Sequence, residues 1–321
     1  MTAVMGAAGV VVQVAAIATG APVLVGVMRQ VRARLEGRRG PGIAQPWREM
    51  RKLFGKESIR PEGTTLVFAL APAVLAGSAL VASTLIPVAT TGSPLDSVGD
   101  LFAVIGLLLL GSVALALAGL DTGTAFGGMG ASRAMTIGAL VEPSALLAVF
   151  AVSIPAHSSN LGAIVTAVAS HPARSATPAA ALACAAMAIV VIAESGRLPV
   201  DNPATHLEVT MVHEAMTLEY AGPQLGLLEW AASMRLTLLL ALLANLFLPF
   251  GIATAHAGLA GLGLGLVAIA AKVVVLASLL AGAEVFLAKL RLFRVPELLA
   301  GSFLIGLLAV VVSSFLTATT K

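Results

Sequence analysis

Residues 194–230 read ESGRLPVDNPATHLEVTMVHEAMTLEYAGPQLGLLEW and separate two long apolar runs of the chain. This segment holds six of the sixteen acidic residues: Glu194, Asp201, Glu208, Glu214, Glu219 and Glu229. It also holds His206 and His213, two of the five histidines. A plain connector between helices does not need so many titratable groups. We therefore expect the apolar runs to position this segment, and the segment to carry function.

The apolar runs define the fold class. The chain of 321 residues is 58% hydrophobic and 11% charged, whereas soluble domains have about 25% charged residues. Because about 20 helical residues cross a hydrocarbon core of about 30 Å, runs of this length predict an all-α polytopic integral membrane protein with about eight transmembrane helices. Eight spans use up the chain, so residues 1–321 are expected to form a single membrane domain.

Hydropathy places these eight spans along the chain, the fifth being short and rich in alanine. The first lacks a positively charged leader and is expected to be retained rather than cleaved. The predicted spans are Val4–Met28, Thr64–Ala89, Leu101–Leu120, Met135–Ile154, Ala176–Ala193, Leu236–Ala255, Leu259–Glu284 and Leu298–Leu316.

The distribution of Lys and Arg predicts the orientation. Ten of the nineteen basic residues lie between Arg29 and Arg60, and positive residues gather in cytoplasmic loops. The predicted cytoplasmic loops are about 29–63, 121–134, 194–235 and 285–297, with both termini outside the inner (cytoplasmic) membrane. Basic residues beside a span do not indicate nucleic acid. The single cysteine, Cys184, excludes an internal disulfide and a cysteine-bound zinc or iron–sulfur site on this chain.

Two of these loops have a recognisable pattern. In Gln45–Phe54, apolar residues including Trp47 alternate at helical spacing with charged residues including Arg51. This pattern predicts an amphipathic helix, which binds either anionic headgroups or a partner protein. Residues 121–134, DTGTAFGGMGASRA, are rich in glycine but lack the GK[ST] ending of a phosphate-binding loop. A flexible turn is predicted there.

Charged residues inside or at the ends of spans require an explanation, because an ionised side chain at mid-bilayer costs about 2.5–3.5 kcal/mol on insertion. They are Glu142, Glu194, Lys272 and Glu284, and we predict that they belong to a proton path. The structural alternatives are a local Glu194–Arg197 pair, solvation of Glu284 at the interface, and a buried interhelical salt bridge for Glu142 and Lys272. Buried carboxylates can change protonation near neutral pH, which suits them to proton transfer.

Residues Thr205–Tyr220 are predicted to be helical. His206 and His213 then lie two turns apart on one face, with Glu214 next to His213. This is not the HExxH pattern, in which two histidines four residues apart share one zinc. Contacts with a partner or with a buried water path are the preferred interpretation, and no metal site is predicted.

Several segments resemble one family. The segments are AESGRLPVDNP, HLEVT and HEAMTLEYAGP, RRGPG in the first loop, GASRAMTIGALVEPS before and within the fourth span, and KLRLFRVPELLAG before the last span. They resemble a membrane subunit that is shared by two complexes. These are respiratory complex I, where it is subunit 1, and the energy-converting nickel–iron hydrogenases. The match is stronger to the formate hydrogenlyase-type, or group 4, branch. The resemblance covers nearly the whole chain.

The resemblance implies a subunit that joins a soluble redox arm to antiporter-like membrane subunits. Glu142, Glu194, Glu208 and Glu219 match family positions of the acidic path into the membrane. Arg133, Arg197 and Asp201 match loop positions of the family. In complex I, the stretch after the aspartate–proline pair is richer in glutamate, whereas Ala204 and His206 stand here. Together with a longer 208–220 segment and a shorter first loop, this favours the hydrogenase branch over a quinone chamber.

We therefore predict a non-catalytic membrane subunit of an oxidoreductase complex of the formate hydrogenlyase type, coupling electron transfer to proton or sodium translocation. No cofactor is expected on this chain. A nickel–iron centre and iron–sulfur clusters are expected on its partners, a soluble hydrogenase-like large subunit and an iron–sulfur small subunit. The alternatives are a quinone-chamber subunit of a proton-pumping NADH:quinone oxidoreductase, a stand-alone ion transporter and a purely structural scaffold. The missing inverted repeat disfavours the transporter.

Overall fold

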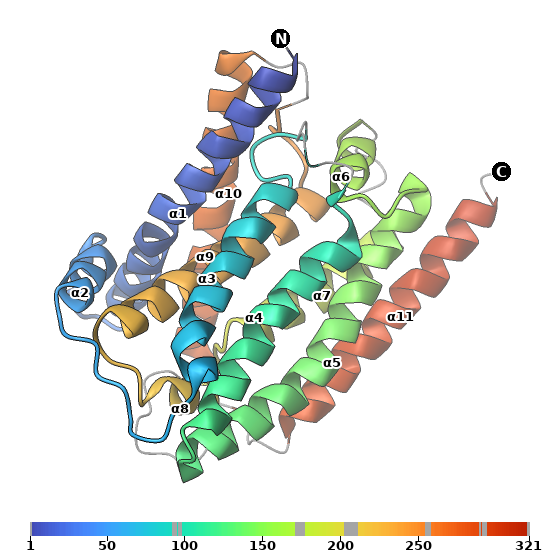
Figure 1. Cartoon of the computed structure of the whole chain (residues 1–321). Coiled ribbons are helices and arrows are strands. Elements are labelled where there is room, and N and C mark those ends of the chain that lie inside the picture. Colours follow the sequence, from blue (N-terminus) through green and yellow to red (C-terminus); the bar gives the residue numbers. More distant parts are fainter. Residues whose placement is uncertain are drawn as a thin grey trace.

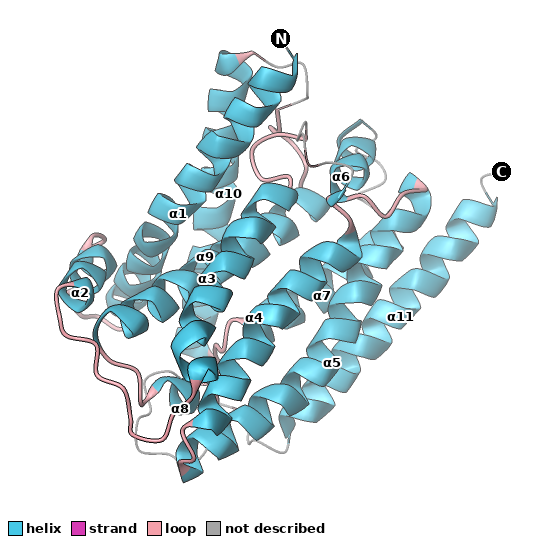
Figure 2. Ribbon diagram, viewed as in Figure 1, coloured by secondary structure: helices cyan, strands magenta, loops and turns pink. Residues whose placement is uncertain are grey.

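The computed structural model describes residues 2–91, 95, 98–170, 177–201, 211–253, 258–288, 290 and 294–319. Within these ranges the chain forms helices and no strand (Figure 2). The helices are α1 (Thr2–Leu35), α2 (Gln45–Phe54), α3 (Leu66–Leu85), α4 (Leu101–Asp121), α5 (Ala125–Ala156), α6 (Leu161–Ser170), α7 (Pro178–Glu194), α8 (His213–Thr217), α9 (Gly222–Phe247), α10 (Leu259–Phe286) and α11 (Val295–Thr319).

Seven of the helices in the described ranges are long and apolar enough to cross a membrane: α1, α3, α4, α5, α9, α10 and α11. The predicted all-α membrane fold is therefore confirmed. The fifth predicted span corresponds to α7, an apolar helix of 17 residues. At 1.5 Å per residue it is about 25 Å long, somewhat less than the hydrocarbon core. It packs against α5, α9 and α11, and its small alanine side chains allow the close approach.

The long helices run side by side, with α1 and α10 along one edge and α11 along the other (Figure 1). Both chain termini lie at one end of the molecule, which we name the terminal face. The short helices α2 and α8 lie at the opposite end, which we name the α2/α8 face. The main apolar core joins most of the long helices, and a smaller one, which includes Phe68 and Tyr220, lies beneath α8.

The amphipathic helix is confirmed at its predicted bounds, Gln45–Phe54. Met50 is buried, and Leu53 lies beside Gly226 at the start of α9. Trp47 is partly exposed, and its indole Nε1 donates to the carbonyl of Thr19 in α1 at 3.1 Å. The basic extension of the first span is also present, since α1 continues to Leu35.

Two loop predictions are wrong. Residues 121–134 are not a flexible turn, because α5 begins at Ala125 and the hydroxyl of Thr124 accepts from the backbone N–H of Gly127 as its cap. Likewise, α9 begins at Gly222 rather than near Leu236, so that Arg235 lies inside a membrane helix and not in a loop. Hydropathy averages over a window, so it misses a helix start that is rich in glycine, as in α5, or mixed with polar residues, as in α9.

The predicted helix Thr205–Tyr220 is confirmed only in part. Helix α8 covers His213–Thr217, whereas residues 205–210 lie outside the described ranges. On the terminal face, α6 is a further short helix that the hydropathy pattern did not predict. Its ten residues are too few to cross a membrane, and its apolar face packs against α5 and α9.

Candidate functional site

Two adjoining hollows lie between the helices near the α2/α8 face. The first, which we name the inner hollow, includes Ser112 (α4), Gly138 (α5), Glu194 (α7), His213 (α8) and Arg235 (α9) in its lining. Its empty volume is about 850 Å³, counted with its opening to solvent. The second, the outer hollow, has about 1070 Å³ on the same basis. Residues shared by the two linings, among them Asp201 and His213, connect them.

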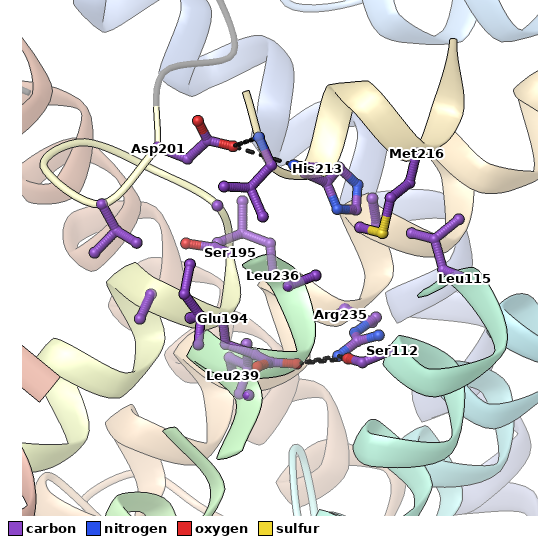
Figure 3. Close-up of a pocket in the computed structure, with 18 of the residues that line it drawn as sticks. Ser112, Leu115, Glu194, Ser195, Asp201, His213, Met216, Arg235, Leu236 and Leu239 are labelled. Carbon is purple, nitrogen blue, oxygen red and sulfur yellow. Dashed lines mark hydrogen bonds and ion pairs between the residues drawn. The ribbon is translucent and has the colours of Figure 1, made fainter. Parts of the chain in front are cut away.

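Glu194, the last residue of α7, is held by an ion pair in the inner hollow (Figure 3). Its Oε1 accepts hydrogen bonds from Nη2 of Arg235 and from the hydroxyl of Ser112, the latter at 3.2 Å. Nη2 of Arg235 also lies 2.8 Å from the Ser112 hydroxyl. The arginine is 9% exposed, and a buried ion pair of this kind is costly to break by removing one partner.

Glu142 lies one helical turn after Gly138 on α5. Its Oε1 is only 3.9 Å from the position that a Cβ on Gly138 would occupy, and Gly138 lines the inner hollow. Glu142 is also within electrostatic range of both Glu194 and Arg235. It forms no ion pair with any residue in the described ranges.

Asp201 and His213 lie where the two hollows meet. Asp201 is 3% exposed, and its Oδ2 accepts from the backbone N–H groups of Val212 and His213, each at 3.2 Å (Figure 3). Burial lowers the pKa of His213, and the charge of Arg235 lowers it further, while Asp201 opposes the shift. The imidazole is thus held in its neutral form, which can both accept and donate a proton.

The outer hollow opens toward α1 and α2. Its lining includes Arg29, Met50, Arg197, Glu214 and Glu229. Of the predicted docking residues, Arg197 and Glu214 lie in this lining, whereas Arg51 is exposed on α2. The outer hollow thus brings acidic and basic groups together beside the amphipathic helix.

Arg197 and Glu284 form a second buried ion pair. Nη1 of Arg197 lies 2.9 Å from Oε1 of Glu284, and Nη1 of Arg32 lies 3.9 Å from Oε2. The local Glu194–Arg197 pair is therefore wrong, since each residue has a distant partner instead. Interface solvation of Glu284 is also wrong, because its side chain is 4% exposed.

Lys272 lies away from both hollows. Its Nζ donates to Oδ1 of Asn245 at 3.2 Å and lies 4.5 Å from the ring centroid of Phe250. The salt bridge considered as the alternative for Glu142 and Lys272 is not formed. The position of Lys272 gives it no direct contact with the carboxylates of the inner hollow.

The remaining predicted site residues are distributed as follows. Arg133, on α5, donates from Nη1 to the backbone carbonyl of Met211 at 3.3 Å and so holds the segment before α8. Glu219 is half-buried but lines neither hollow. Glu208 and His206 lie outside the described ranges. Among the described residues, no three His, Cys, Asp or Glu side chains converge as ligands of a metal ion would.

Arg235, Ser112 and Glu229 belong to the site but were not predicted from the sequence. A signal for Arg235 was available, because Gly222–Pro223 is a typical helix start and would have extended the sixth span backward. Ser112 carried no signal, since a hydroxyl inside an apolar helix commonly bonds its own backbone. Only the tertiary structure, which brings Ser112 of α4 within hydrogen-bond distance of Glu194 on α7, shows its second partner.

Comparison with known proteins gives the family. The profile of the NADH dehydrogenase family matches residues 8–315. Formate hydrogenlyase subunit 4 of Escherichia coli (strain K12) is 37% identical over 292 residues, which is 91% of this chain and 93% of that protein. Hydrogenase-4 component C of the same strain is 37% identical over 230 residues, or 72% and 71% of the two chains.

More distant relatives extend the same set. An NADH-quinone oxidoreductase subunit of Syntrophobacter fumaroxidans is 32% identical over 243 residues, covering 70% of this chain and 71% of that protein. In fold, the chain is similar to one in the structure of an archaeal membrane-bound sulfane sulfur reductase, with a TM-score of 0.82 at 20% identity, covering 95% and 98% of the two chains. The chain belongs to the NADH dehydrogenase subunit 1 family.

Proposed function

We propose that this chain is the membrane subunit of a formate hydrogenlyase-like, group 4 hydrogenase complex, where it couples electron transfer to proton or sodium translocation. Its relatives are subunits of hydrogenase and NADH-quinone oxidoreductase complexes. The observation that carries the proposal is the run of titratable groups along the two hollows. It passes from Glu214 and Glu229 through Asp201 and His213 to Glu194 and Glu142.

The α2/α8 face is the proposed docking surface for the soluble redox subunits. It carries the amphipathic helix, with Trp47 and Arg51, and the mouth of the outer hollow, with Arg197 and Glu214. The nickel–iron centre and the iron–sulfur clusters belong to the soluble large and small subunits in this proposal, and this chain contributes no redox step. Antiporter-like membrane subunits receive the protons. The complex lies in the inner membrane, with both termini of this chain outside.

Carboxylates in membrane proteins commonly serve as proton carriers, and the proposed path uses the carboxylates of the two hollows in this way. Water fills the gaps between groups that lie beyond direct hydrogen-bond distance. A change at the docking surface alters the charge near Asp201 and His213, and Glu194 and Glu142 respond by taking up or releasing a proton. Glu208 and Glu219 are expected to contribute at the entrance of this path.

Substitution of the two inner glutamates tests the proposal. Glu142→Gln and Glu194→Gln keep the side-chain shape but remove the titratable group. Each is expected to abolish proton movement in proteoliposomes containing the whole complex, while the complex still assembles. Glu62→Gln, an exposed glutamate outside both hollows, is the matched control. Full translocation by both inner variants would contradict the proposal.

The second candidate is a quinone-chamber subunit. The inner hollow favours it, because apolar side chains such as Leu75, Leu115 and Met216 surround its few polar groups, as in many ligand sites. Quinone-dependent turnover of the complex, blocked by inhibitors that compete with quinone, would support this function. Turnover without added or bound quinone would exclude it.

A further inference from the structure

One arginine serves two carboxylates in the inner hollow. Arg235 bonds Glu194 directly, and Glu142 lies within electrostatic range of both. The guanidinium reaches from α9 to the backbone of α4, where its Nη1 is 3.1 Å from the position that a Cβ on Gly111 would occupy. Because Gly111 has no side chain, the arginine can lie at this point in the space between α4, α7 and α9 (Figure 3).

The other charged groups around the guanidinium are few. Asp201 and His213 line the hollow on its α8 side, and their backbone contacts hold them in place. Helices α3 and α4 contribute serine hydroxyls, those of Ser78 and Ser112. Within the described lining, Arg235 is the one arginine or lysine, and its direct partner is Glu194.

The charge balance requires a proton. With both glutamates ionised, the group of Glu142, Glu194 and Arg235 carries one net negative charge inside the membrane domain. A charge left without a counter-ion inside a membrane domain is unfavourable, so the group gains a proton instead. Whichever carboxylate pairs with the guanidinium stays ionised, and the other holds the proton. The position of the arginine therefore determines the position of the proton.

We propose that Arg235 is a positioning residue, a counter-ion that Glu194 and Glu142 share in turn. The inference rests on the proposed function, since it assigns a control step to the same path. In the structure Arg235 pairs with Glu194, and the inference assigns the proton of this state to Glu142. A proton brought into the hollow as hydronium then forms the O–H bond of Glu194 and leaves a neutral water molecule, and the guanidinium turns to Glu142. Glu142 releases its proton to a water molecule or a carboxylate of a neighbouring membrane subunit, so that one proton enters and one leaves.

Arg235→Gln and Arg235→Lys test this step in the whole complex, reconstituted in proteoliposomes. The glutamine variant removes the cation, and we expect redox turnover to continue while protons moved per electron fall at least about tenfold. Because loss of a nearby cation raises a carboxyl pKa by about one to three units, the pH profile of the remaining proton movement should shift upward by a similar amount. The lysine variant keeps the charge and should restore most of the coupling.

Two further variants keep the test decisive if Arg235→Gln does not assemble. Arg235→Gln/Glu194→Gln removes both charges of the ion pair and is the assembly control, because neither partner is then left as an unpaired buried charge. Gly111→Ala crowds the guanidinium, because its Cβ would lie 3.1 Å from Nη1 of Arg235 and 2.7 Å from Cδ1 of Leu75. It should reduce coupling with the arginine still present. Arg34→Gln, an exposed arginine outside both hollows, should change neither readout.

The outcomes separate this inference from the proposed function. Normal coupling and an unshifted pH profile in Arg235→Gln would overturn the shared counter-ion. So would equal impairment of the lysine and glutamine variants without a shift of the profile, since that result indicates a structural role alone. If Glu142→Gln and Glu194→Gln also retain full proton movement, the proposed function fails as well. If those two lose it and Arg235→Gln does not, only the role of Arg235 is overturned.

Discussion

Nη1 of Arg197 donates to Oε1 of Glu284 at 2.9 Å, although 87 residues separate them along the chain. The other oxygen of the same carboxylate lies 3.9 Å from Nη1 of Arg32. One buried glutamate on α10 thus fastens the segment after α7 to α1. This segment leads directly to Asp201, so the ion pair stabilises the wall between the two hollows.

Glu284→Ala is expected to lower the free energy of unfolding by about 3–5 kcal/mol, because it leaves Arg197 without its buried anion. Chemical denaturation of the detergent-solubilised protein measures the loss. Glu49→Ala is the matched control: its pair with Arg29 is exposed on both sides, at 37% and 44%, and should contribute less than about 1 kcal/mol. Equal losses in the free energy of unfolding for the two variants would show that the buried Glu284 pair stabilises the protein no more than the exposed Glu49 pair.

Gly222→Ala is expected to destabilise the start of α9 by about 2 kcal/mol or more. Gly222 has φ +57°, a left-handed conformation that costs an L-residue about 1–2 kcal/mol. A Cβ there would also lie 2.3 Å from the backbone oxygen of Glu57. Thermal unfolding and protease cleavage near Glu57 report the change. Gly128→Ala, where no atom lies within 4 Å of the new Cβ, should be neutral or stabilising; a similar loss there would contradict the argument.

His213 should make stability depend on pH. Burial lowers its pKa in the folded protein below the ordinary value of 6.5, with a further contribution from Arg235. The unfolded chain therefore binds the proton more readily, and the stabilisation present above about pH 6.5 is lost as the pH falls through the folded pKa. Melting temperatures at pH 7.5 and pH 5.5 test this, with pH values chosen about one unit either side of the ordinary pKa.

His213→Asn should remove part of the difference between the two melting temperatures. His157→Asn, which changes an exposed histidine at the end of α5, should leave the difference as it is. An undiminished difference in His213→Asn would show that other groups cause the acid sensitivity.

Gln13→Leu should cost about 2–4 kcal/mol, since Gln13 is 2% exposed and its amide bonds four backbone groups. Its Nε2 donates to the carbonyls of Ser83 and Ile86, and its Oε1 accepts from the N–H groups of Val88 and Ala89. Leucine has a similar size but leaves these buried groups unpaired. Denaturation measures the loss, and Gln13→Glu, which keeps only acceptors, should also destabilise. A stable Gln13→Leu variant would mean that water replaces the amide.

The sequence predicted the parts of this fold that depend on local composition. Apolar length identified the long helices, and the alternation of charged and apolar residues gave α2 at its observed bounds. It failed where a helix begins in polar sequence, as α9 does at Gly222. Hydropathy averages over a window of residues, whereas the start of a helix depends on backbone conformation and on the residues that pack against its first turn.

By itself, the sequence determined that this protein is an all-α membrane protein, and its acidic 194–230 segment identified the titratable residues around which the site forms. Only the tertiary structure decided their partners. It paired Glu194 with Arg235 instead of the neighbouring Arg197, and Arg197 with Glu284 on α10. The physical reason is that a buried charge takes whichever opposite charge the helix packing places within hydrogen-bond distance, and distance along the chain does not determine that placement.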